Sequence, residues 1–243
     1  MDKTSEIAEY FLLVARTPSH KSNLFLGHAA PAFTSSKDRD KVHIANFGSA
    51  ALPKYKPHVP EDKAKEAHNH FWKQSLPLAI TSSLGLGILG YVAGQDSPLL
   101  AKAVLSLGGA LTGTFSSLMY AGYRTKPGAL IIEEPDHERD KELNRSYYKI
   151  KITPEQYKAM IKNIEAKTGE QPFSTWRNNC ARLTLTQLEK ADQYNGQNPD
   201  VKRSIPLRVF NITTPRYVEH VMEDLVSQGI AEQIDINPEN SFE

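Results

Sequence analysis

The chain of 243 residues is long enough for one or two domains. Its 29 basic and 28 acidic side chains are mixed along the sequence and give a net charge of +1, which offers no electrostatic basis for binding nucleic acid. The single cysteine, Cys180, excludes an intramolecular disulfide and leaves one candidate for thiol chemistry.

Residues 10–50 are predicted to be mostly β-structure. Strands are expected over 10–16, 23–33 and 41–47, followed by an extended, proline-rich linker over 51–62. The apolar run at 10–15 is too short for a secretory signal, so no cleaved leader is predicted.

Side-chain alternation assigns faces to the second and third strands. Four residues of the second strand are expected on one face: Leu24, Leu26, His28 and Ala30. Three residues of the third strand are likewise expected to share a face: His43, Ala45 and Phe47.

Two uncharged segments, 76–94 and 103–123, follow the linker. Each is about 20 residues long, the length that an α-helix needs to cross roughly 30 Å of hydrocarbon. Both contain glycines at the four-residue spacing that lets two helices approach closely, at Gly90 and Gly94 and at Gly109 and Gly113. The pattern predicts a helical hairpin in a membrane, with a pair of buried helices in a soluble core as the alternative.

The residues that flank the hairpin indicate its orientation. Basic residues stand on both outer sides: Lys63, Lys65, Lys73, Arg124 and Lys126. Because cytoplasmic flanks carry the excess of positive charge, both termini are expected in the cytoplasm. Whether the hairpin spans the bilayer or only inserts into one leaflet is left open by the sequence.

The chain after the hairpin mixes strands and helices. Strands are expected over 129–133 and 147–152. Thr153, Pro154 and Gln156 form a capping box that starts a helix, which Gly169 is expected to end. Further helices are predicted from Asn179 and over 215–228. Neither soluble part is expected to form a core alone, so 1–62 and 124–243 are predicted to fold together, with 63–123 as an insertion.

Cys180 is predicted in the first turn of its helix, with Asn179 as the cap. The free amides and partial positive charge of a helix N-terminus are expected to lower the pKa of the thiol and to stabilise an oxyanion. The alternative is that Cys180 is a small buried hydrophobic residue.

The order of these residues resembles a known superfamily. Gly27-His28 is predicted on one strand, His43 on the next, and Asn179-Cys180 at a later helix start. This resembles the permuted papain-like superfamily, including lecithin–retinol acyltransferase-like enzymes and bacterial domains of the lipoprotein N-acyltransferase type. The resemblance covers 25–50 and 130–192, and it implies an α+β fold in which an antiparallel sheet packs on helices.

The resemblance also implies a mechanism. His28 would accept the proton of Cys180 and return it to the leaving group, and His43 would orient His28 or polarise the site. An acyl-thioester on Cys180 would pass to water, an amine or a hydroxyl. Neither a cofactor nor a metal site is predicted, because no Cys/His set has zinc spacing and no glycine-rich phosphate loop follows a strand.

These observations favour a membrane-anchored thiol hydrolase or acyltransferase that acts on an amide or ester, with membrane lipid as a partner and a lipid or protein as substrate. A cysteine protease or deamidase is the nearest enzymatic alternative. The alternatives from other classes are a non-catalytic membrane adaptor on the same scaffold and a host-directed, membrane-active bacterial protein.

Overall fold

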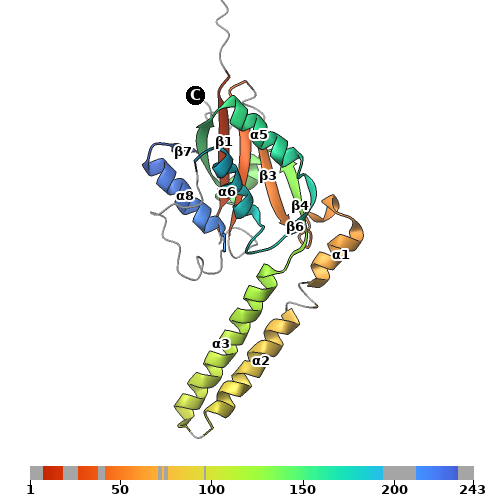
Figure 1. Ribbon diagram of the computed structural model, residues 1–243, viewed down its shortest axis with the longest axis vertical. Coiled ribbons are helices and arrows are strands. Elements are labelled where there is room, and N and C mark those ends of the chain that lie inside the picture. The colour runs from red at the N-terminus through yellow and green to blue at the C-terminus, as the bar shows by residue number, and fades with distance from the viewer. Residues whose placement is uncertain are drawn as a thin grey trace, which may run out of the picture. The chain divides into compact units, whose positions relative to one another are not determined.

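Figure 1 shows the computed structural model, which describes residues 8–18, 27–37, 42–70, 73, 76–95, 97–193 and 212–234. The protein is α+β, with a seven-stranded antiparallel sheet, covering helices and a long pair of apolar helices. The chain divides into two compact units, one of 1–48, 129–171 and 176–243, the other of 49–128 and 172–175. The boundaries expected from the sequence are at 62/63 and 123/124.

The sheet has the strand order β6-β4-β3-β2-β1-β5-β7. Its strands are β1 (Tyr10–Thr17), β2 (His28–Ser35), β3 (His43–Ser49), β4 (Lys126–Glu133), β5 (Ser146–Ile152), β6 (Gly169–Phe173) and β7 (Ala231–Ile234). Four of the expected strands form, with ends shifted by up to three residues: those predicted over 10–16, 41–47, 129–133 and 147–152. The expected second strand begins only at His28, and its residues 23–26, with Leu24 and Leu26, lie outside the described part of the chain.

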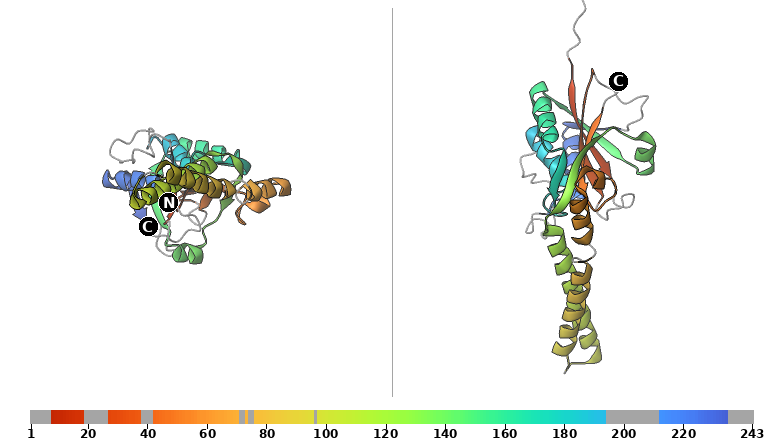
Figure 2. Two further views of the ribbon diagram at one scale, coloured as in Figure 1. Left: turned by 90° about the horizontal axis from the view of Figure 1, so that it is seen from below. Right: turned by 90° about the vertical axis from the view of Figure 1, so that its right-hand side faces the viewer.

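The first unit contains helices on both faces of the sheet. They are α4 (His137–Glu142), α5 (Pro154–Glu165), α6 (Cys180–Lys190) and α8 (Pro215–Ser227). Figure 2 shows α5 and α6 on one face and the short helix α4 on the other. The strands between them are almost fully buried, as expected for a sheet covered on both sides.

Capping residues define the helix starts in this unit. Thr153 and Gln156 form the predicted reciprocal capping box of α5, and Thr214 caps α8 by accepting from the Tyr217 amide. The prediction that Gly169 ends α5 is wrong. The helix stops at Glu165, and Gly169, with a φ of 102°, begins β6 instead.

The second unit contains the 3₁₀ turn η1 (Lys56–His58) and the helices α1 (Glu61–Asn69), α2 (Leu76–Ala93) and α3 (Leu99–Tyr123). The expected linker over 51–62 is therefore not fully extended: η1 lies within it, and α1 begins at Glu61 directly after Pro60. The predicted helix over 103–123 begins four residues earlier, because Pro98 is an N-cap and Lys102 is already helical.

The helices α2 and α3 are long and apolar enough to cross a membrane by length and composition. At 1.5 Å per residue they are roughly 27 and 37 Å long, and the hydrocarbon core is about 30 Å thick. Their large side chains are exposed to an extent unusual for core helices, for example 62% at both Leu84 and Leu111. They can therefore form the predicted membrane hairpin, and the alternative of a buried helix pair does not describe them.

Hydroxyl groups within the hairpin have protein partners. Thr112 donates to the Gly108 carbonyl and Thr114 to the Ala110 carbonyl within α3, and Ser117 donates across to the Leu78 carbonyl of α2. Such bonds suit an apolar surrounding, because a polar group without water must find a partner in the protein.

Glycines let the backbones of α2 and α3 touch. A Cβ atom added at Gly109 would lie 2.1 Å from the Leu86 carbonyl oxygen, and one at Gly113 would lie 2.3 Å from the Ser82 carbonyl oxygen. No atom lies within 4 Å of the corresponding position at Gly108. The close approach predicted from the glycine spacing therefore occurs, at Gly90, Gly109 and Gly113.

We expect Gly109→Leu to separate the two helices and Gly108→Leu to leave them packed. Forcing side-chain atoms against a backbone carbonyl typically costs about 1–3 kcal/mol, so Gly109→Leu should lower the thermal midpoint of the detergent-solubilised protein by several degrees. Equal midpoints for the two variants, measured by fluorescence-detected gel filtration after heating, would contradict this packing.

Candidate active site

His28 begins β2 and follows a residue with an unusual backbone. Gly27 has a φ of 78°, a conformation that side-chain-bearing residues rarely adopt. The register of β1 and β2 pairs His28 with Thr17 and Ala29 with Arg16. His28 is therefore fixed at the start of a central strand, in a half-buried position.

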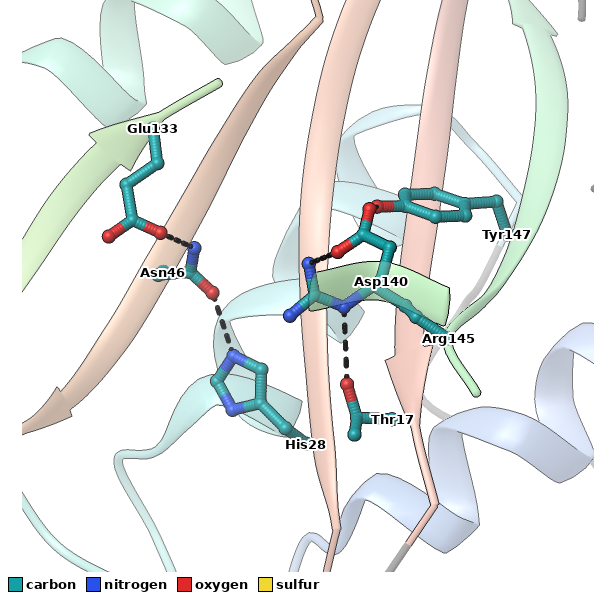
Figure 3. Close-up of polar contacts among 7 residues, drawn as sticks. All are labelled: Thr17, His28, Asn46, Glu133, Asp140, Arg145 and Tyr147. Carbon is teal, nitrogen blue, oxygen red and sulfur yellow. Dashed lines mark hydrogen bonds and ion pairs between the residues drawn. The ribbon is translucent and has the colours of Figure 1, made fainter. Parts of the chain in front are cut away.

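The His28 ring pairs with Asn46 of β3. Nε2 of His28 lies 2.8 Å from Oδ1 of Asn46, and Nδ2 of Asn46 donates a 2.7 Å hydrogen bond to Oε2 of Glu133 at the end of β4. Figure 3 shows the three side chains in one line across the sheet. Asn46 is buried and both ends of its amide are paired, which holds it in place.

Cys180 is the first residue of α6, with the predicted cap. The Asn179 side chain accepts from the Arg182 amide and donates to the Thr213 carbonyl at 2.8 Å. The backbone amides of Ala29, Ala181 and Cys180 itself lie near enough to the sulfur to act on the pKa of its thiol. The Ala29 amide belongs to the peptide that joins His28 to Ala29, so the thiol lies beside the backbone of the histidine strand.

Pro31 explains why a strand amide is available to the thiol. Among the described residues, β2 and β3 pair at Ala32–Ile44 and Phe33–His43. Pro31 has no N–H to donate to a neighbouring strand, and amides two residues apart point the same way, so Ala29 faces the same side of β2. Pairing with β3 ends next to Pro31, so the Ala29 amide is not used in the pairing of β2 with β3.

The expectation of a lowered thiol pKa is wrong for the structure as it stands. Cys180 is only 7% exposed, and this burial raises the pKa of its thiol, although the three amides act in the opposite direction. Desolvation penalises the thiolate more than the helix N-terminus stabilises it. The resting thiol is consequently neutral at pH 7.

The structure does not bring His43 to His28. His43 is paired with Phe33, five residues along β2 from His28, which at about 3.3 Å per residue is roughly 17 Å. The position expected for His43 beside the His28 ring is held by Asn46. Alternation along β3 places Asn46 on the face opposite His43. The register of β2 and β3, which brings Asn46 to His28, could not be predicted from sequence spacing.

A second polar network adjoins His28 through Thr17. Arg145 donates from Nη1 to Asp140 at 2.6 Å and from Nε to Thr17 at 3.2 Å, and the Tyr147 hydroxyl donates to the other Asp140 oxygen (Figure 3). Burial, with help from Asp140, raises the pKa of Tyr147 above its usual range. This network joins α4, β5 and β1, and it fixes the end of β1 that faces His28.

Groups of three or more His, Cys, Asp or Glu side chains that could hold a metal ion do not occur among the described residues. Among known proteins, no family model, curated sequence or solved structure matches this chain. The candidate site is therefore defined by its own geometry.

Proposed function

We propose that the protein is a membrane-anchored thiol hydrolase or acyltransferase, with Cys180 as nucleophile and His28 as base, on a permuted papain-like fold. One observation carries the proposal. The Cys180 thiol lies near the backbone amide of Ala29, the residue directly after His28, while Nε2 of the His28 ring is paired with Asn46. A Cys-His-Asn set is the arrangement used by papain-like proteases.

Asn46 takes the third role in place of His43. By accepting from Nε2–H of His28, its carbonyl oxygen puts the proton of the neutral ring on Nε2, so that Nδ1 carries the lone pair that would receive the thiol proton. The histidine strand precedes the cysteine helix, as in the permuted scaffold which the sequence resembles. That scaffold carries a second histidine on the next strand, and here Asn46 of β3 takes its role.

The buried, neutral thiol determines how the reaction begins. Nδ1 of His28 removes the Cys180 proton as the sulfur attacks the carbonyl carbon, so no separate thiolate is needed beforehand. The amides at the start of α6 stabilise the negative charge that develops. The imidazolium then returns its proton to the leaving amine or alkoxide, and the acyl-thioester passes to water, an amine or a hydroxyl.

The apolar hairpin supports a membrane location. Its two exposed helices have the length of a bilayer crossing, and basic residues flank both outer ends. The proposal places both termini in the cytoplasm, with membrane lipid as a partner and a lipid or lipidated protein as the substrate class.

Intact-mass measurement after incubation with membranes tests the function. We expect wild-type protein to acquire one discrete acyl mass that hydroxylamine removes, as a thioester requires. The Cys180→Ala variant should stay unmodified. A wild-type protein without any adduct, or an adduct of equal yield in Cys180→Ala, would contradict the proposal.

A second candidate is a non-catalytic membrane adaptor on the same scaffold. It is favoured by the burial of Cys180, which would then serve as a small core residue. For the adaptor, Cys180→Ala should leave every activity of the protein intact, and the thiol should react no faster than a buried cysteine without a base.

A further inference from the structure

Glu133 determines which way the Asn46 amide points. A carboxylate can only accept hydrogen bonds, and the amide nitrogen of asparagine can only donate. The 2.7 Å bond between Nδ2 of Asn46 and Oε2 of Glu133 therefore directs Oδ1 of Asn46 toward His28. The reversed amide would place two acceptors against each other.

The amide orientation in turn selects one tautomer of His28. Oδ1 of Asn46 is an acceptor 2.8 Å from Nε2, so Nε2 must carry the proton of the neutral ring. Nδ1 is then unprotonated. A ring with the proton on Nδ1 could not accept a proton from a thiol at that atom.

We infer that Glu133 is a positioning residue, which keeps His28 in the Nε2–H tautomer through Asn46. The inference rests on the proposed function for its consequence, since only the base role of His28 makes the tautomer matter. Asn46 lies between the two partners and is buried. Water therefore cannot replace His28 and Glu133 as hydrogen-bond partners while the amide turns over.

The position of Glu133 in the sheet brings its carboxylate to Asn46. Glu133 is the last residue of β4, and β4 lies next to β3 in the strand order. Its neighbour Glu134 is exposed. Glu134→Lys is therefore a matched control for Glu133→Lys, because both make the same change of charge but only Glu133→Lys alters the contact with Asn46.

The tautomer can be measured directly on the full-length protein in detergent, labelled with ¹⁵N-histidine. Long-range ¹H–¹⁵N correlation distinguishes the two neutral tautomers, and the His28 signal among eight histidines is assigned by its loss in His28→Ala. We expect wild-type protein and Glu134→Lys to have the proton on Nε2. In Glu133→Lys the ammonium group can only donate, so the Asn46 amide should reverse and the proton of His28 should move to Nδ1.

A parallel measurement of the reaction of Cys180 with iodoacetamide should show a fall of at least about tenfold in Glu133→Lys and no change in Glu134→Lys, because a base in the wrong tautomer loses most of its effect. Should Glu133→Lys not fold, Glu133→Leu takes its place, with a mixture of both tautomers as the expected result.

An Nδ1–H ring in the wild-type protein, or an unchanged Nε2–H ring in the folded Glu133 variants, would overturn the inference. These outcomes are separate from failure of the proposed function, because the tautomer is read in the resting protein without any substrate. If the tautomer changes as expected but the reactivity of Cys180 does not, the positioning stands and the base role of His28 fails.

Discussion

Replacing His28 with alanine should lower acyl transfer to Cys180 by about 100- to 10,000-fold, the usual contribution of a general base. The effect is large because the thiol is buried and neutral, so little thiolate exists at pH 7 without a group that takes its proton. The rate is measured as the first-turnover release of p-nitrophenolate from a p-nitrophenyl fatty ester by the detergent-solubilised protein.

His43→Ala is the matched control for this experiment. His43 lies on the neighbouring strand but is paired with Phe33, far along β2 from the thiol. It should leave the first-turnover rate within a factor of about two. Equal losses in the two variants would mean that neither histidine is the base, and a loss in His43→Ala alone would favour the role expected for His43 from the sequence.

Two charges in the middle of the hairpin should release the protein from membranes. Leu84 and Leu111 lie near the centres of α2 and α3 and are exposed. A lysine at a helix centre costs about 2.5–3.5 kcal/mol on insertion scales. The double variant Leu84→Lys/Leu111→Lys should therefore fail to float with liposomes of phosphatidylcholine and phosphatidylglycerol.

The double variant Leu84→Ala/Leu111→Ala serves as its control, because it shortens the same side chains without adding charge. It should still float with the liposomes. Lysine-bearing protein that remains in the lipid fraction would show that α2 and α3 are covered by protein and not by lipid.

Local patterns in the sequence predicted the helices that begin with recognisable capping residues. The capping box at Thr153 and Gln156 gave the start of α5, and Asn179 gave the start of α6 with Cys180 in its first turn. The uncharged runs gave the helix pair. In each case the determining atoms lie within a few residues of one another, so no knowledge of the fold was required.

The predictions that were wrong concern contacts between residues that are far apart in the sequence. The position of Asn46 beside His28 depends on the register of β2 and β3 and on Glu133, which is 87 residues further along the chain. The pKa of Cys180 follows from how completely β2 and its neighbours bury the sulfur. Sequence spacing contains neither quantity, although Pro31 was a visible sign that pairing would end near His28.

The central claim is that His28 takes the proton of Cys180, and the alkylation rate of that single thiol at pH 7 tests it most directly. With iodoacetamide as a small neutral reagent, wild-type protein should react at least about tenfold faster than His28→Ala. Identical rates in the two proteins, with both thiols slower than free cysteine, would contradict the claim and leave Cys180 a buried structural residue.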